Sequence, residues 1–596
     1  MTPGRDIHSF SEPHRVRVTH CSLNLEVSFT DRKLSGAAVL EFTRFDPEAP
    51  LILDTRDLEI HEISTGDERR ALDFSLGKRD PILGAPLTIH LPPDAASVCI
   101  RYSTAPSASG LQWLTPEQTA GKEHPFLFSQ NQSIHARSWI PIQDSPGVRV
   151  TYNARIKAPA PLRALMSAEQ IESCGGIWKF AMDLPVPAYL IALAVGDVEF
   201  CATGARTGVY AEAPTLRAAT SEFSDTEKLI EAVEELYGPY LWGRYDLLVL
   251  PPSFPFGGME NPCLTFVTPT VLAGDKSLVG LISHELAHSW SGNLVTNATW
   301  SDFWLNEGFT TYIENRIQEK VYGREQALME QVLDRRDLDA ELSKLPAGDQ
   351  ILHIDLAGRD PDEGCTRVPY VKGALFLRSM EQAFGRAVFD DFLRAYFRHF
   401  AFQSITTGEA LNYLETELLN RYQEQGVQIA VRQWIYEPGL PASAPAAVSS
   451  RLQEVVNLAG KWERGELEAS AIDTSSWRTQ EWLEFLQVLQ RPVGTDRLLA
   501  LDAAFRFTRS GNYEVLHEWL LMAIKSGYEP AYPRLERFLL QVGRTRYIRP
   551  LYEELMKSPE GRQKAQRIYA AARAGYHPIT QTALDKVVRP ESHFSR

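Results

Sequence analysis

The pentapeptide from His284 to His288, which reads His-Glu-Leu-Ala-His, restricts the local fold more than any other part of the chain. On an α-helix, two residues four apart project from the same face, so both imidazoles can bind one metal ion. Zinc is the metal that this spacing favours. The pattern therefore predicts a helix that carries a zinc site, with Glu285 beside the metal.

A third ligand follows in the segment WSDFWLNEGFTTYIE, where Glu307 stands among large apolar residues such as Trp300 and Trp304. An unpaired carboxylate is costly in such a setting, and coordination by zinc removes that cost. The alternative is a core Glu paired with Arg or Lys. Together with His284 and His288, Glu307 predicts one Zn²⁺ per chain.

Two His and one Glu leave a fourth zinc position open for water, which is typical of a catalytic site. Zinc lowers the pKa of a bound water toward about 7, and Glu285 is placed to take its proton. This combination predicts hydrolysis of an amide bond, with Glu285 as the general base.

The segment FPFGGMENP contains residues that could recognise the free N-terminus of a peptide substrate. The carboxylate of Glu260 can pair with a substrate α-ammonium. Gly257 and Gly258 let the backbone come close to an extended substrate, and Met259 lies between them and Glu260. A Gly-Gly turn with an exposed Glu is also a common loop.

The whole chain sets further limits. Its 596 residues predict several domains, and its net charge of -15 argues against nucleic acid as a partner. No apolar stretch is long enough to span a bilayer. Six widely spaced cysteines fit reduced thiols, so we expect a cytoplasmic protein without a membrane partner. These cysteines are Cys21, Cys99, Cys174, Cys201, Cys263 and Cys365.

Hydrophobic periodicity divides the chain. Period two dominates from Val16 to Val195, as in Leu23, Leu25 and Val27, and predicts a β-rich region. The residues from Ser221 predict a capped amphipathic helix, and those from Tyr245 a short buried strand. We expect domains at 1–197 (β-sheet), 198–440 (catalytic) and 450–596 (stacked helices), with a Pro-rich linker at 441–449.

The motifs GGMEN, HELAH and NEG resemble the gluzincin zinc aminopeptidases, and the text around them is most similar to the leukotriene A(4) hydrolase and aminopeptidase B branch. The segments QNQSIHARSWIPIQDSP, RVPYVKG and GRTRYIRPLYEEL extend the resemblance over nearly the whole chain. It implies a multidomain α+β protein with an N-terminal β saddle, a thermolysin-like zinc catalytic domain and a C-terminal α-helical, armadillo-like solenoid.

The resemblance also implies roles for single residues. Tyr370 would donate a hydrogen bond to the oxyanion of the transition state, and Gln132 with Glu260 would hold the substrate α-amine. Arg544 and Arg546 would bind the carboxylate of short peptides. Asp362 would line the pocket for the first side chain.

Two positions depart from the mammalian epoxide hydrolases of this branch. Cys365 stands five residues before Tyr370, and Phe256 precedes Gly257, where those enzymes carry Tyr. We therefore expect a monomeric aminopeptidase that acts on short peptides with a free N-terminus, in peptide catabolism. The alternatives are an epoxide hydrolase acting on a leukotriene-like lipid, as a second or main activity, and an inactive peptide-binding scaffold.

Overall fold

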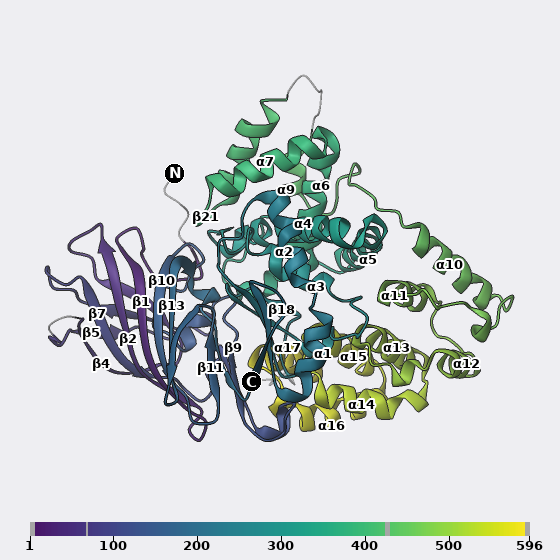
Figure 1. The fold of residues 1–596 in the computed structure, drawn as a ribbon, viewed down its shortest axis with the longest axis horizontal. Helices are drawn as coiled ribbons and strands as arrows, with labels where there is room; N and C mark the ends of the chain where they lie inside the picture. Colours follow the sequence, from purple (N-terminus) through teal and green to yellow (C-terminus); the bar gives the residue numbers. More distant parts are fainter. Residues whose placement is uncertain (1–5, 67–68, 423–428, 590–596) are drawn as a thin grey trace, which may run out of the picture.

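The computed structural model describes residues 6–66, 69–422 and 429–589, and the chain passes through three regions (Figure 1). The first region is built of strands, the second combines a mixed sheet with helices, and the third is helical. In Figure 1 the strands of the first region lie at the left, and the helices of the third region extend along the lower part of the molecule from the centre to the right. This arrangement confirms the predicted fold class.

Alternating burial builds the main N-terminal sheet. In β1 (Val16–Ser28), Leu23, Leu25 and Val27 are buried, whereas Asn24 and Glu26 are exposed, as the period-two pattern predicts. The sheet has the order β12-β13-β10-β1-β2-β7-β4. Its other strands are β2 (Lys33–Arg44), β4 (Glu59–Thr65), β7 (Ser97–Ser103), β10 (Arg149–Lys157), β12 (Glu169–Cys174) and β13 (Ile177–Pro187).

Two smaller sheets complete this region. One has the order β11-β14-β9-β8, and the other has the order β3-β6-β5. The loop that follows β9 leads toward the site described below. The strands are β3 (Leu51–Thr55), β5 (Phe74–Leu76), β6 (Ala85–Ile89), β8 (Leu111–Leu114), β9 (Phe126–Ser129), β11 (Arg163–Met166) and β14 (Leu193–Gly196).

The central region starts with a five-stranded sheet of order β15-β16-β17-β19-β18. Its middle strand β17 (Tyr245–Val249) is the predicted buried strand, and every residue in it is buried. It pairs in parallel with strands on both sides, which explains its continuous apolar pattern. The other strands are β15 (Glu199–Ala202), β16 (Thr207–Ala211), β18 (Gly258–Met259) and β19 (Leu264–Val267).

The predicted helix from Ser221 is present, but its start was wrong. Ser221 belongs to α1 (Ala213–Glu222), and the amphipathic helix α2 (Thr226–Tyr237) begins after a turn. The chain turns there because Phe223 is buried and the Glu222 carboxylate accepts hydrogen bonds from Gly274 and Lys276. These tertiary contacts outweigh the local helical pattern.

The remaining central helices include α3 (Gly280–Ala287), which carries the HELAH motif, and α4 (Trp304–Tyr322), which packs against it. The others are α5 (Arg324–Leu342), α6 (Gly373–Phe384), α7 (Arg386–His399), α8 (Thr407–Leu414) and α9 (Val431–Tyr436). A π-helical turn at Val368–Lys372 precedes α6. The short strands β20 (Val295–Asn297) and β21 (Gln403–Ile405) pair beside them.

The C-terminal helices stack as a solenoid. Helix α11 packs against α13, α13 against α15, and α15 against α17, while α14 packs against α16, so the odd and even helices form two layers. The predicted turns are present, and Gly527 ends α13 at a φ of 66°. The helices are α10 (Ser450–Glu463), α11 (Thr479–Val488), α12 (Thr495–Phe505), α13 (Tyr513–Ser526), α14 (Tyr532–Gln541), α15 (Thr545–Leu555), α16 (Pro559–Ala572) and α17 (Pro578–Val588).

Buried apolar residues form two large clusters. One extends from Val16 to Ile435 through the first two regions, and the other from Val455 to Val588. The predicted domain boundaries at 197/198, 440/441 and 449/450 stay predictions. Among the described residues, no helix is both long and apolar enough to cross a bilayer.

Candidate metal centre and active site

Two packed helices bring the three predicted metal ligands together. His284 lies in the last turn of α3 and His288 caps that helix, while Glu307 lies in the first turn of α4. The Nε2 atoms of His284 and His288 are 3.2 Å apart. Glu307 Oε2 lies 3.3 Å from His284 Nε2 and 3.6 Å from His288 Nε2. All three candidate ligand atoms therefore lie close enough together to contact one ion.

The surroundings of these ligands fit a divalent metal. Nδ1 of His284 donates to Glu314 Oε2 at 3.0 Å, and Nδ1 of His288 donates to the carbonyl of Ser291 at 3.0 Å. These bonds direct both Nε2 atoms toward Glu307. Glu307 Oε2 is buried and has no hydrogen-bond partner among the described residues. Two imidazole nitrogens and one carboxylate oxygen match the ligands that zinc prefers.

Burial and neighbouring charges set the ionisation of each ligand differently. Burial lowers the pKa of His288 to about 4, which keeps the imidazole neutral, as a metal ligand must be. Burial acts in the same direction on His284, but contacts with Glu307 and Glu314 raise its pKa well above the ordinary value. Burial acts against ionisation of Glu307, yet the two imidazoles hold its pKa below the ordinary value.

Glu285 and Glu260 lie next to the ligands. One carboxylate oxygen of each lies within 4.8 Å of the other and of a ring nitrogen of His288. A Cβ atom at Gly258 would lie 2.3 Å from Glu285 Oε1, so only glycine lets this strand pass the carboxylate. Burial raises the pKa of Glu285 to about 8, with the charge of His284 opposing it.

Glu260 is a buried acid with an unpaired oxygen. It is 3% exposed, and its Oε1 has no hydrogen-bond partner among the described residues. Burial raises its pKa well above the ordinary value, and the charges of Glu307 and Glu285 add to the effect. A cationic ligand would relieve both the missing hydrogen bond and the repulsion.

The segment that carries Gln132 connects two parts of the site. Gln130 Nε2 donates to Met259 Sδ at 3.2 Å, and the backbone N–H of Ser133 donates to Asp362 Oδ1 at 3.1 Å. Gln132 lies between these two bonds in the chain. Its Nε2 is buried and has no hydrogen-bond partner among the described residues.

Asp362 has partners for both oxygens. Besides the Ser133 contact, its Oδ2 lies 3.3 Å from Nε2 of His135. Arg56 Nη1 donates to Nδ1 of His135 at 2.9 Å, so the Nε2–H of the neutral imidazole donates to Asp362. Burial acts against ionisation, but the His135 contact keeps the pKa of Asp362 below its ordinary value.

Tyr370 lies over the metal ligands. Its ring is stacked on that of His284, with centroids 6.0 Å apart, and meets Phe303 edge to face. Burial raises the pKa of Tyr370 well above its ordinary value, and the charge of Glu307 adds to this. The phenol therefore keeps its proton at neutral pH and can donate it in a hydrogen bond.

Arg544 and Arg546 come from the helical region. Arg544 is buried, and Nη1 donates to Tyr547 Oη at 2.6 Å and Thr270 Oγ1 at 3.2 Å. A Cβ atom at Gly257 would lie 2.8 Å from Arg544 Nη2, so this guanidinium meets the GGMEN segment. The Arg546 side chain is 53% exposed and lies 3.9 Å from Glu514.

Sequence reasoning missed three partners of the site. Glu314 orients His284, and its position seven residues after Glu307 on one helix face could have revealed it. His135 contacts Asp362, and Glu514 lies between the two arginines. No local pattern pointed to the last two, because their partners are far away in the chain.

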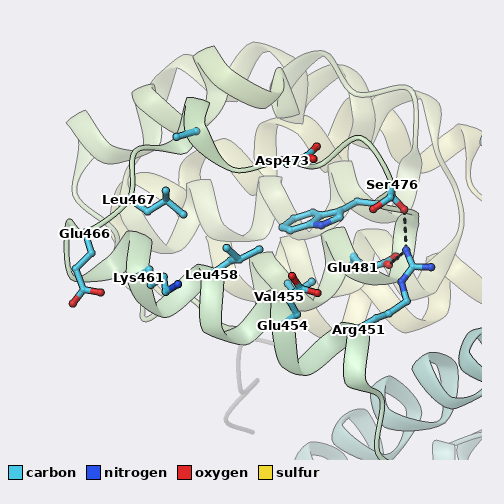
Figure 2. A pocket seen from close by; sticks show the side chains of 12 residues that line it. Arg451, Glu454, Val455, Leu458, Lys461, Glu466, Leu467, Asp473, Ser476 and Glu481 are labelled. Atoms are coloured by element: carbon cyan, nitrogen blue, oxygen red, sulfur yellow. Dashed lines mark hydrogen bonds and ion pairs between the residues drawn. The ribbon is translucent and has the colours of Figure 1, made fainter.

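A cavity of about 640 Å³ lies outside this site, beside α10 and α11. Its lining includes none of the predicted site residues. Trp477, Leu458 and Val455 supply the apolar part of the wall. Figure 2 shows Arg451 hydrogen-bonded to the backbone of Ser476 at one end of this cavity.

Comparisons with known proteins agree over the whole chain. Residues 17–190 match the Peptidase M1 N-terminal domain, 221–434 the Peptidase family M1 domain, and 477–588 the domain described as Leukotriene A4 hydrolase, C-terminal. Leukotriene A-4 hydrolase of Xenopus laevis is 38% identical over 98% of both chains. Leucine aminopeptidase 2 of Yarrowia lipolytica is also 38% identical, over 98% of this chain and 93% of its own.

Solved structures show the same fold. Yeast LTA4 hydrolase in complex with bestatin superposes with a TM-score of 0.92 at 33% identity, over 99% of this chain and 98% of its own. An M1 zinc metallopeptidase from Deinococcus radiodurans matches 74% of this chain and 100% of its own, with a TM-score of 0.60 at 23% identity.

Proposed function

Because this chain belongs to the M1 family of zinc-dependent peptidases, we propose that it removes single residues from the free N-terminus of short peptides. Family membership makes it a zinc metallopeptidase and favours an enzyme over a peptide-binding scaffold. One observation supports recognition of the free N-terminus. Glu260 Oε1 and Gln132 Nε2 are buried polar atoms without hydrogen-bond partners among the described residues. A substrate α-ammonium and its neighbouring carbonyl would satisfy both.

His284, His288 and Glu307 would hold the zinc ion. When bound, zinc polarises the scissile carbonyl and acidifies water. Glu285 takes a proton from the attacking water and transfers it to the leaving amine, so that one peptide bond and one water give an amino acid and a shortened peptide. The proximity of Glu285 to His288 and Glu260 supports this role.

Tyr370 would donate to the oxygen that becomes negative as the carbonyl turns tetrahedral. Its place over His284 and its raised pKa support this role. At the other end, Arg544 and Arg546 would bind the carboxylate of short peptides. The closeness of Arg544 to Gly257 supports a cleft only a few residues long.

Asp362 would line the pocket for the first side chain and favour Arg. Its contacts with Ser133 and His135 support a fixed, ionised carboxylate next to the Gln132 segment. The test is Asp362→Asn, which should lower the ratio of Arg to Ala turnover. An unchanged ratio would remove Asp362 from the pocket.

Hydrolysis of a lipid epoxide is a second candidate activity. The relative from Xenopus laevis is named leukotriene A-4 hydrolase, and the C-terminal domain match bears the same name. Cys365 and Phe256 replace tyrosines of the mammalian enzymes, so we rank this activity below peptide hydrolysis. We also propose a cytoplasmic monomer in peptide catabolism, and the free cysteines support the cytoplasmic location.

Arylamides of Arg, Ala and Leu, each with a free and an N-acetylated α-amine, test the proposal. We expect turnover of the free amines only, loss of activity after chelation, and recovery with zinc. Equal turnover of the acetylated substrates would contradict the role of Glu260 and indicate an endopeptidase. No turnover by zinc-loaded protein would overturn peptide hydrolysis and direct attention to epoxides.

A further inference from the structure

Lys372 is a fully buried cation that the mechanism above does not use. Its exposed fraction is 0%, and among the described residues its Nζ donates to two backbone carbonyls and to no carboxylate. Burial lowers its pKa to about 8, with the charge of Glu437 opposing the shift. Because an unpaired buried charge is costly, its retention calls for a compensating role.

The ammonium group of Lys372 joins three segments of the chain. Nζ donates to the carbonyl of Gln350 at 2.8 Å and to that of Glu437 at 2.8 Å. Gln350 ends the short helix that starts at Ala347, and Glu437 caps the C-terminus of α9. A cation at a helix C-terminus also meets the negative end of the helix dipole. Lys372 therefore fixes its own turn against two separate supports.

That turn carries Tyr370. The π-helical turn Val368–Lys372 holds the tyrosine over His284, and π-helical turns are frequent at functional sites. Just beyond it, a Cβ atom at Gly373 would lie 2.7 Å from the Cα of Gly308, the residue after Glu307. The end of this turn therefore packs closely against α4, which carries Glu307. Lys372 also hydrogen-bonds it to the carbonyls of Gln350 and Glu437.

We propose that Lys372 is a positioning residue that fixes the height of the Tyr370 hydroxyl over the zinc ligands. This inference rests on the proposed role of Tyr370 as the donor to the developing oxyanion. A donor stabilises the transition state only when it is held at hydrogen-bond distance, and a displacement of about 1 Å can cost about 100-fold in rate. The two hydrogen bonds of Lys372 supply that restraint.

The test starts with Lys372→Met, which removes the donors and keeps an unbranched side chain of similar length. We expect kcat for an alanine arylamide to fall about tenfold, with KM within twofold of wild type and one zinc per chain. Binding of a phosphinic dipeptide, which mimics the tetrahedral state, should weaken by a similar factor. Binding of free arginine should not change.

A double-mutant cycle with Tyr370→Phe decides between positioning and a general structural role. If Lys372 acts through the hydroxyl, Lys372→Met should cost little more in the Tyr370→Phe background. The matched control is Leu377→Ala, a buried change in α6 that lowers the unfolding temperature without removing either carbonyl contact. It should leave kcat near wild type.

The outcomes separate the inference from the proposed function. An equal loss from Lys372→Met in both backgrounds, or no loss at all, overturns the inference alone. A fully active Tyr370→Phe enzyme overturns the role of Tyr370 and the inference with it. If Lys372→Met does not fold, Lys372→Leu, which also removes both donors, takes its place in the same cycle, with the same outcomes.

Discussion

The two ends of the proposed substrate cleft are built in different ways. The metal end uses residues of two packed helices, between His284 and Glu307, within one apolar cluster. The carboxylate end depends on Arg544, which belongs to the helical region and its separate cluster. The proposed metal ligands therefore come from one short stretch of the chain, whereas the proposed carboxylate site brings Arg544 of the second cluster to the first.

The loop before Gly257 joins the two ends. Backbone N–H groups of Gly543 and Thr545 donate to the carbonyls of Pro252 and Pro255, at 2.8 and 2.9 Å. Arg544 lies between these two bonds, so the same loop that leads to Glu260 also places the guanidinium. A change on one side of the junction should thus affect binding without affecting the metal.

The largest effect should come from the metal end. Glu285→Gln keeps the shape of the side chain but removes the base, so we expect kcat to fall by about 1000-fold. Metal analysis should still give one zinc per chain, because the three ligands are unchanged. Undiminished arylamide turnover would contradict the mechanism, and loss of zinc would show that Glu285 supports the ligands.

The next effect tests the support of His284. Glu314→Gln removes the carboxylate that orients the imidazole, and we expect zinc affinity to fall about 10- to 100-fold. Competition with a chelator measures this, and excess zinc should restore most of the activity. Glu319→Gln, on the same helix and paired with Arg386, is the matched control and should bind zinc normally.

A smaller effect should arise at the carboxylate end. Arg544→Met removes a buried cation, so KM for a tripeptide should rise about tenfold, whereas KM for its C-terminal amide should change little. Arylamide kcat should stay near wild type, which separates this end from the metal end. Arg549→Met, an exposed change on the same helix, is the control. Equal effects on acid and amide would exclude carboxylate binding.

The smallest effect concerns stability at the junction. Burial opposes ionisation of Glu514, but Arg546 and Arg544 lower its pKa from 4.5 to about 2. Because the pKa of Glu514 is lower in the folded than in the unfolded protein, its ionisation stabilises the fold at pH values above 4.5. This stabilisation is lost as the pH falls through about 2. Glu514→Gln should therefore be less stable by on the order of 2 kcal/mol at pH 7.

Thermal unfolding at several pH values measures this difference. The gap between wild type and Glu514→Gln should be constant above about pH 5 and should narrow as pH falls toward 2. Glu553→Gln, an exposed change on α15, is the control and should show little gap at any pH. A gap that widens on acidification would contradict the assigned pairing of Glu514.

Part of the fold was predictable because it depends on local patterns. Three local patterns predicted elements that the structure contains. Alternation predicted the strand β1, the apolar run predicted the buried strand β17, and Gly-containing turns predicted breaks between the late helices. The start of α2 was wrong, because the contacts of Phe223 and Glu222 end the preceding helix. Such contacts join residues that are far apart in the chain, and no single-sequence pattern reports them.

The sequence by itself predicted a cluster of His284, His288 and Glu307, because helical spacing places the two histidines on one face and Glu307 follows in a nearby helix. Their roles as metal ligands, and that of Glu285 as the base, stay predictions. Only the tertiary structure decided what surrounds them. Three contacts join segments that meet only in the packed chain. They are the contact between Gly308 and Gly373, the hydrogen bonds of Lys372, and the approach of Arg544 to Gly257. Close packing makes these contacts specific, and they determine how substrate is held.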